Sequence, residues 1–258
     1  MHRTLSALVL AATVALSAQQ AAPDAAYQKA LAYFEQRNYD ACLTAIRAAI
    51  KESEENADAR VLAAHCHVGK KNYADAVAHL RAVAEEVPDR TDVKEDIVAL
   101  LIEQGKFRDA RRAGYRFSEE LKDGEKPVPA SLTLLVARAE LGYGKPQNAL
   151  TLARDVKKSD DATVKYGGLI TETRALIALG NFSEADISLS FAESMRESEL
   201  HPLLRAMIEE SKWIQQKYPE DQRAAIVAAY EKLARSEDAT VRAAVQKNIE
   251  RVKAAKAN

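Results

Sequence analysis

The sequence predicts an all-α protein built from a row of antiparallel helix pairs. The same pattern occurs five times. A helical stretch ends in a short turn, and the turn is followed by an aromatic residue or proline, two further residues and then a small residue. The small residues are Cys42, Ala76, Ala110, Ala149 and Ala185, so the steps are 34, 34, 39 and 36 residues. A period near 34 is typical of stacked helix–turn–helix units. Strand signals are nearly absent, because the chain lacks long alternations of β-branched residues.

Compact residues also stand at the facing position of each preceding helix. These residues are Ala30, Ala64, Val98, Ala137 and Thr173. Two compact faces shorten the distance between helix axes, so each pair is expected to pack closely. Further along each second helix, an inward stripe continues through Ile46, Leu80, Gly114, Ala153 and Leu189. Gly105, Gly144 and Gly180 fall at the turns inside pairs, where a left-handed residue ends a helix at little cost.

This spacing resembles that of the tetratricopeptide repeat family over about residues 23–195. The resemblance implies a right-handed α-solenoid of helix pairs, called A and B, that is non-catalytic and holds peptides on an inner wall of A helices. The repeats are divergent: helix A lacks the family's common tryptophan, and Lys29 and Glu172 stand where leucine is usual. Residues 122–129 are extra and are predicted to form a loop.

The domain prediction is one continuous array. Residues 19–200 are expected to form five helix pairs, and residues 201–258 a degenerate pair with a capping helix. Val241, Val245, Ile249 and Val252 line one face of that last helix, as a cap over the final repeat requires. Trp213 is interpreted as a structural anchor of the cap.

Residues 1–18 have the order of a secretory signal peptide. Met1-His2-Arg3 is a basic start, residues 5–16 are apolar, and Ser17 and Ala18 are small residues suited to cleavage. Twelve apolar residues make only about 18 Å of helix, too short to span a bilayer. We therefore expect a soluble, exported protein, periplasmic in a Gram-negative bacterium and secreted otherwise.

Charge and motifs give no support for nucleic-acid binding, catalysis, a cofactor or a metal. The formal net charge is −1, with 37 basic and 38 acidic residues. No phosphate-binding glycine loop, His-Glu-x-x-His or Cys-x-x-Cys occurs. His65 and His67 lie about 200° apart on a helix and cannot share one ion. His67 is expected to pack against its own helix B, and His65 to face the inner wall.

Cys42 and Cys66 are predicted to lie on neighbouring helices. In an exported protein they could form a disulfide, which would close a loop of about 24 residues. The alternative is two buried thiols that fill small slots, and we favour the thiols because disulfide geometry is demanding.

The candidate binding residues follow from the register of the A helices. They are Tyr27, Leu31, Phe34, Val61, His65, Leu134, Arg138, Ile170 and Arg174. So many apolar side chains on a surface indicate either a docking site or core contacts with the next repeat. Arg138 and Arg174 could hold a carboxylate bidentately, or could instead pair with Glu140 and Glu172.

The leading functional hypothesis is a non-enzymatic adaptor or scaffold of the bacterial envelope. Its partner would be a protein or peptide segment with apolar anchors and an acidic group or free C-terminus. A structural, self-assembling envelope subunit is the alternative. A glycan-cleaving enzyme would need a catalytic domain, for which the last segment leaves no room.

Overall fold

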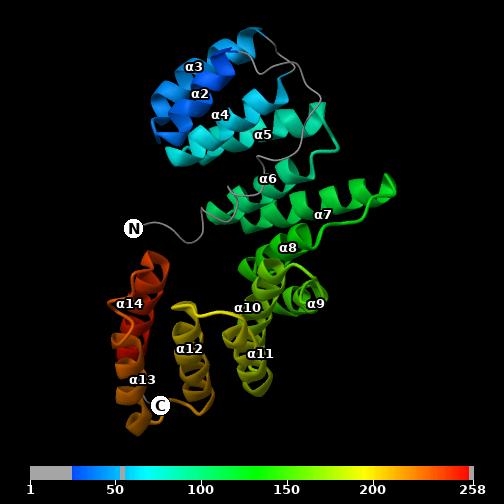
Figure 1. The fold of residues 1–258 in the computed structure, drawn as a ribbon. Coiled ribbons are helices and arrows are strands. Elements are labelled where there is room, and N and C mark those ends of the chain that lie inside the picture. Colours follow the sequence, from blue (N-terminus) through cyan, green and yellow to red (C-terminus); the bar gives the residue numbers. More distant parts are fainter. Residues whose placement is uncertain (1–24, 53–55, 256–258) are drawn as a thin grey trace. The chain divides into compact units, whose positions relative to one another are not determined.

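The structure is a computed structural model that describes residues 25–52 and 56–255, and within these ranges the chain is helical with no strand (Figure 1). The predicted signal peptide, residues 1–18, lies outside the described residues. Contacts divide the chain into two compact units whose boundary falls between Val136 and Ala137, inside helix α8. Each unit is described by itself below. None of the described helices is both long and apolar enough to cross a lipid bilayer.

The N-terminal unit consists of three helix pairs and the beginning of α8. Its helices are α2 (Ala25–Glu35), α3 (Tyr39–Glu52), α4 (Ala57–Gly69), α5 (Tyr73–Glu86), α6 (Thr91–Glu103), α7 (Phe107–Asp123) and α8 (Ala130–Gly142). Each helix packs on its neighbours in the chain from α2 to α7, so the even-numbered helices are the A helices and the odd-numbered ones the B helices. Residues 124–129 form the connection to α8, close to the predicted loop.

The C-terminal unit continues the same alternation. After the rest of α8 it contains α9 (Pro146–Val156), α10 (Ala162–Leu179), α11 (Phe182–Met195), α12 (Leu200–Gln215), α13 (Glu220–Glu231) and α14 (Ala239–Ala254). Helix α10 packs on α9, α11 and α12, and α14 packs on α12 and α13. The all-α array of helix pairs predicted from the period is therefore confirmed.

The small residues of the repeat are fully buried between the paired helices. Zero exposure is found for Ala30, Ala64, Val98, Ala137 and Thr173 on the A helices and for Cys42, Ala76, Ala110, Ala149 and Ala185 on the B helices. Gly114 is also explained, because a Cβ at this position would lie 2.5 Å from Cγ2 of Val136. The missing side chain of Gly114 on α7 thus makes room for the valine of α8.

The turns inside the first five pairs use one left-handed residue each. Gly105, Gly144 and Gly180 have φ of 69°, 81° and 77°, as predicted. In the first two pairs the same backbone conformation is adopted by Arg37 (φ 58°) and Lys71 (φ 62°), whose Cβ atoms make it unfavourable.

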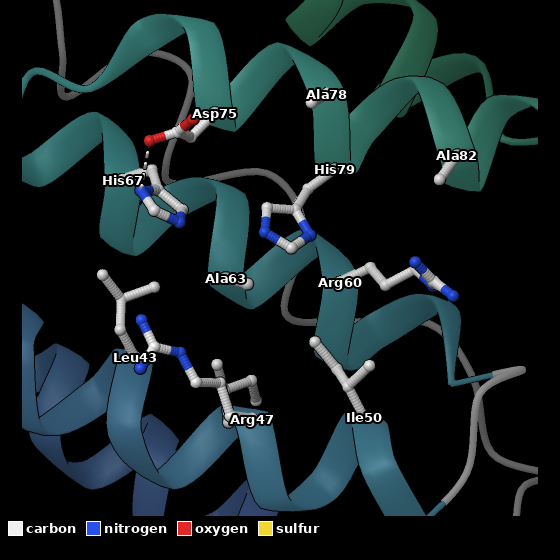
Figure 2. A pocket seen from close by; sticks show the side chains of 11 residues that line it. Leu43, Arg47, Ile50, Arg60, Ala63, His67, Asp75, Ala78, His79 and Ala82 are labelled. Atoms are coloured by element: carbon white, nitrogen blue, oxygen red, sulfur yellow. Dashed lines mark ion pairs between the residues drawn. The ribbon is translucent and has the colours of Figure 1, made fainter.

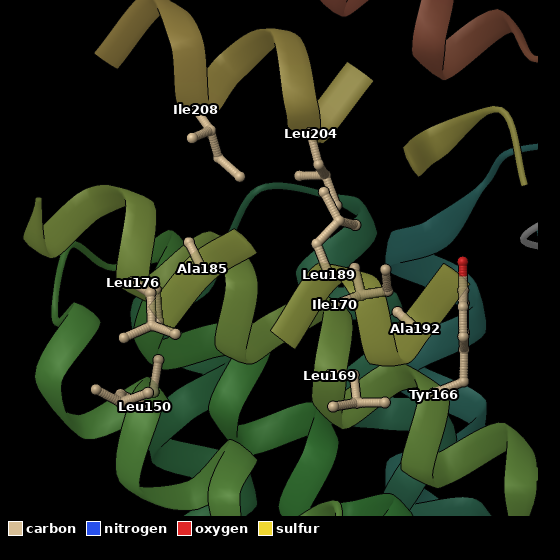
Figure 3. Close-up of a cluster of buried hydrophobic side chains, with 12 residues drawn as sticks. Leu150, Tyr166, Leu169, Ile170, Leu176, Ala185, Leu189, Ala192, Leu204 and Ile208 are labelled. Atoms are coloured by element: carbon tan, nitrogen blue, oxygen red, sulfur yellow. The ribbon is translucent and has the colours of Figure 1, made fainter. Parts of the chain in front are cut away.

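Helix α10 lies at the centre of an apolar core that includes Tyr166, Leu169, Ile170, Leu176, Leu189 and Leu204 (Figure 3). Helix α10 starts at Ala162. Asp161 caps it by accepting hydrogen bonds from the backbone N–H groups of Thr163 and Val164. Gly168 therefore lies inside the helix, where a Cβ would meet the backbone nitrogen of Lys157 at 3.1 Å.

The C-terminal helices form a cap with its own core. Val241, Val245, Ile249 and Val252 are buried as predicted, together with Trp213. The Trp213 indole Nε1 donates to the carbonyl of Pro219 at 2.8 Å, and its ring meets Tyr218 edge-on at 4.9 Å. Both contacts satisfy the indole internally, so Trp213 is a structural anchor.

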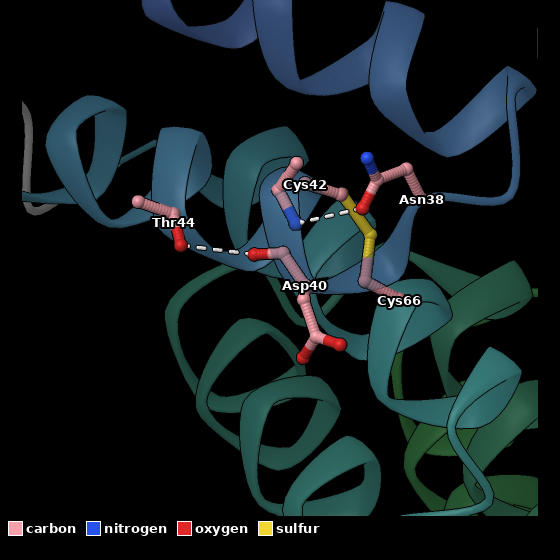
Figure 4. The surroundings of a disulfide bond; sticks show 6 residues. Asn38, Asp40, Cys42, Thr44 and Cys66 are labelled. Carbon is pink, nitrogen blue, oxygen red and sulfur yellow. Dashed lines mark hydrogen bonds between the residues drawn. A yellow bond between two sulfur atoms is a disulfide. The ribbon is translucent and has the colours of Figure 1, made fainter.

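Cys42 of α3 and Cys66 of α4 are joined in a disulfide (Figure 4). The preference for two separate thiols was therefore wrong. Helices α3 and α4 pack directly, and the two Cα atoms are 6.6 Å apart, within the range that a disulfide can span. The bond links the B helix of the first pair to the A helix of the second.

Replacing Lys71 with glycine should stabilise the protein by about 0.5–1 kcal/mol, because glycine adopts the left-handed turn without a Cβ penalty.

Gly180→Ala should destabilise the protein by about 1 kcal/mol, and the cost is purely conformational because no atom lies within 4 Å of the added Cβ. Urea unfolding measures both changes, with Lys71→Ala as the control for loss of the lysine side chain. A Lys71→Gly variant less stable than Lys71→Ala would contradict this account.

The disulfide predicts that denatured, unreduced protein takes up no alkylating reagent, while reduced protein takes it up at both cysteines. Cys42→Ala with Cys66→Ala should lower the free energy of unfolding by about 3 kcal/mol, as expected for a loop of this length. Mass spectrometry after iodoacetamide treatment gives the first result, and urea unfolding the second. Two alkylated cysteines without reductant would exclude the bond.

Candidate functional site: the A-helix faces

The A-helix face of the N-terminal unit carries most of the predicted apolar residues, but not all are available. Tyr27, Leu31 and Phe34 on α2 are half-buried and reach the surface. Val61 on α4 and Leu134 on α8 are buried. Those two residues were predicted as binding anchors, and the structure instead places them in the core, with only 8% and 7% of their surface exposed.

His65 is held by the next A helix. Its Nε2 lies 3.3 Å from Oδ2 of Asp96 on α6, and both side chains are about 15% exposed. The ring also lies 6.2 Å from that of Phe34. His65, Phe34 and Asp96 thus form a contact that runs across three successive A helices.

Acidic residues line the A helices beside this contact, and the sequence analysis missed them. Arg90 joins Asp58 of α4 to Asp92 of α6, with N–O distances of 2.9 and 2.8 Å. The hydrogen bonds that Arg90 donates to the carboxylate of Asp92 raise the pKa of Arg90. Burial, and then the charge of Asp58, raises the pKa of Tyr27. One signal was available: Asp58 and Asp92 are 34 residues apart, which is the repeat period.

Glu95 on α6 extends the acidic row. Its Oε1 accepts a hydrogen bond from the Ser131 hydroxyl of α8 at 2.6 Å. Burial raises the pKa of Glu95, and the hydrogen bond from Ser131 partly offsets that increase. The negative charges of Asp96 and Asp92 raise the pKa of Glu95 further. Glu95 is therefore a carboxylate held at some cost among other carboxylates.

The A-helix face of the C-terminal unit is basic. Arg138 on α8 is half-buried and Arg174 on α10 is exposed, whereas Ile170 is buried and belongs to the core. Ile170 is thus another predicted anchor that the structure assigns to packing. The side chains that remain accessible from the predicted set in this unit are the two arginines.

Glu172 does not pair with Arg174, as one interpretation of the sequence had it. The Glu172 carboxylate is buried and is held by Lys157 at 2.9 Å and Arg154 at 3.1 Å, both from α9. Ser188 of α11 donates to it as well. The charge of Glu172 is therefore neutralised by side chains of the B helices.

Arg174 has no hydrogen-bond or ion-pair partner among the residues that the structure describes. Surrounding protein desolvates its guanidinium and lowers the pKa of Arg174, while the nearby Tyr166 opposes this. Arginine still keeps its charge near neutral pH. Arg174 is therefore a cation that reaches the surface, is partly desolvated by the protein around it, and has no ion-pair partner among the described residues.

Metal chemistry has no geometric basis in the described part of the chain. No group of three or more His, Cys, Asp or Glu side chains there could hold an ion. His67 stacks on His79 of α5 with ring centroids 5.4 Å apart, so it packs against its own helix B as predicted.

Comparisons with known proteins agree with this architecture. The family described as "Anaphase-promoting complex, cyclosome, subunit 3" matches residues 1–83. No curated protein matches the chain in sequence.

Among solved structures, one from a functional characterization of Pseudomonas aeruginosa pilF aligns with a TM-score of 0.59 and 15% identity, covering 88% of this chain and 97% of that one. A tetratricopeptide repeat protein from Parabacteroides merdae gives 0.50 and 11%, covering 88% and 97%. YrrB, described as a TPR protein with an unusual peptide-binding site, gives 0.51 and 11%, covering 78% and 97%. At these identities the similarity concerns the fold alone.

Glu95→Gln should stabilise the protein at pH 7 by on the order of 0.5 kcal/mol, the size of a like-charge repulsion between neighbouring side chains. The raised pKa means that the folded state binds this proton more tightly than the unfolded chain. Ionisation of Glu95 therefore costs stability as the pH rises above its ordinary pKa.

The gain from Glu95→Gln should accordingly be present at pH 7 and absent at pH 4, and urea unfolding at both values measures it. Gln can still accept the Ser131 hydrogen bond. Glu103→Gln, at an exposed position on the same helix, is the matched control. Equal effects of the two substitutions would show that the surroundings of Glu95 are not responsible.

Proposed function

We propose that this chain, which has the fold and the divergent repeats of tetratricopeptide repeat proteins, is a non-enzymatic adaptor that holds a protein or peptide segment on its A-helix faces. The fold supports an interaction role, since a structurally similar protein, YrrB, is described as having a peptide-binding site. The described residues offer no convergent set of titratable groups like those that catalysis requires.

The observation that carries the proposal is the unpaired Arg174. Nearby buried acids in the same unit are neutralised internally, Glu172 by Lys157 and Arg154, and Glu210 by Arg251 at 2.7 Å. Arg174 lies on the A-helix side, and no acid among the described residues forms an ion pair with it. A cation in partly desolvated surroundings gains most from an anionic partner, because the competing interaction with water is reduced. A carboxylate on the partner would supply that anion.

The N-terminal unit would supply a different kind of contact. Tyr27, Leu31 and Phe34 present aromatic and aliphatic surface on α2, and the acidic row of α4 and α6 lies on the same face. Aromatic side chains with some exposure are the usual anchors of protein interfaces. This unit therefore suits apolar anchors, with a preference for neutral or basic flanking residues.

An exported, periplasmic location is also part of the proposal. The order of residues 1–18 motivates it, and the Cys42–Cys66 disulfide is compatible with it, because such bonds persist in oxidising compartments. A bacterial envelope adaptor would meet its partner in that compartment.

The test is capture in the native host by a photoreactive amino acid at Arg138, in the presence or absence of Arg174→Glu. We expect a discrete crosslinked partner whose yield falls about 10- to 100-fold with Arg174→Glu, the effect of losing a charge-assisted hydrogen bond. The mass of the captured chain in the same experiment shows whether residues 1–18 have been removed.

Lys247→Glu is the control for this experiment. Lys247 is exposed on α14 in the same unit, so its reversal changes the net charge equally. Capture that resists Arg174→Glu, or that falls equally with Lys247→Glu, would refute a specific role for Arg174. Circular dichroism of each variant verifies that the helices remain folded.

A further inference from the structure

A hollow of about 410 Å³ opens on the B-helix side of the N-terminal unit, away from the A-helix face. It lies between α3 and α5, above α4 (Figure 2). The volume is within the range of small-molecule sites. Small residues of α4 and α5 create the space, because Ala63, Ala78 and Ala82 leave room that longer side chains would fill.

Two histidines form one wall. His67 and His79 are stacked beside the hollow, facing Leu43, Arg47 and Ile50 of α3 (Figure 2). The Nδ1 atom of His67 is buried without a hydrogen-bond partner, since Oδ2 of Asp75 lies 3.7 Å away. Burial lowers the pKa of both histidines, and for His79 the neighbouring His67 lowers it further. The imidazoles are therefore mostly neutral at pH 7.

Positive charge exceeds negative charge around the hollow. Arg47 has no hydrogen-bond or ion-pair partner among the described residues. Arg60 also lines the hollow and lies 3.5 Å from Glu86. The acid that lines the hollow is Asp75, and its side chain is largely exposed to water. An anion is thus the complementary ligand.

The rest of the lining is apolar. Leu43, Ile46 and Ile50 form the α3 side, and Ala63 lies at the floor. Leu43, Ile46 and Ala63 are packed in the core, so the accessible apolar surface of the hollow comes from Ile50, Ala78 and Ala82. A ligand with one carboxylate and a compact aliphatic or aromatic body would match both parts of the lining.

We propose that the hollow between α3, α4 and α5 binds small apolar monocarboxylates, with the carboxylate at Arg47 and the histidine pair and the apolar body against Ile50, Ala78 and Ala82. This site is separate from the A-helix faces and does not depend on the proposed function. It adds a small-molecule ligand to a protein whose fold otherwise indicates peptide binding.

Binding should strengthen as the pH falls from 7.5 to 6. The charged groups that face the histidines are Arg47 from α3, Arg60 and Lys70 from α4 and Asp75 from α5. A bound carboxylate favours protonated imidazole, and protonation adds positive charge to the site. The ligand itself stays ionised, since carboxylic acids have pKa values of about 4–5.

The experiment is titration of hexanoate into the full chain, with the imidazole signals of ¹⁵N-histidine-labelled protein followed by NMR. We expect saturable shifts of the His67 and His79 signals with a Kd at or below about 10 mM, given the small number of ligand atoms. Hexanamide, which has the same body and no charge, should bind at least about 10-fold more weakly.

Two variants separate charge from shape. Arg47→Gln should weaken hexanoate about 10-fold, and Ala82→Phe, which fills the space, should abolish the shifts. Arg112→Gln, at an exposed arginine on α7, is the matched control and should change nothing. The proposal would be overturned by equal binding of hexanoate and hexanamide, or by unchanged hexanoate binding in Arg47→Gln. It would also be overturned if a 20-fold excess of hexanoate over about 1 mM protein did not shift the His67 and His79 signals.

Discussion

Close contact between small residues inside each helix pair is the constraint on which this structure depends. In the five pairs recognised from the repeat, each helix carries at this position a side chain no larger than valine, and all ten positions are fully closed to solvent. At that separation the backbones set the geometry, so units of different sequence adopt one arrangement. Larger side chains further along the B helices, such as Leu80, Leu189 and Ile46, are closed to solvent as well. This explains how divergent repeats keep the fold.

Charged residues on the A helices follow a second rule. Where a carboxylate is buried, as Glu172 and Glu210 are, cations from neighbouring helices reach it. This agrees with the cost of leaving a buried charge unpaired. Arg174 differs from these residues, because it is an exposed cation for which the described residues supply no ion-pair partner. The acidic row at Asp58, Asp92 and Glu95 gives the other unit an opposite character.

Much of the fold could be predicted from the sequence because the repeat is a matter of residue size and spacing. Small residues and turn glycines lie at fixed intervals, so the helix pairs, the turns and the cap were predictable. The binding residues were harder. Register placed Val61, Leu134 and Ile170 on the inner wall with Tyr27, but register does not say whether the next helix covers a side chain. Predicting the disulfide required an interhelical distance that the sequence does not contain. Predicting the hollow beside His67 required knowing where Ala63, Ala78 and Ala82 lie in three dimensions.

The position of the disulfide has a consequence for how the array comes apart. In repeat proteins each unit is held mainly by its neighbours, so the outermost unit has one supporting surface and frays first. Here a covalent bond ties the first described pair to the second. While it is oxidised, the two pairs cannot separate, and loss of order at this end involves both of them together. Reduction would leave the first described pair held on the second by packing alone, so the order of the face that carries Tyr27 and Phe34 depends in part on this bond.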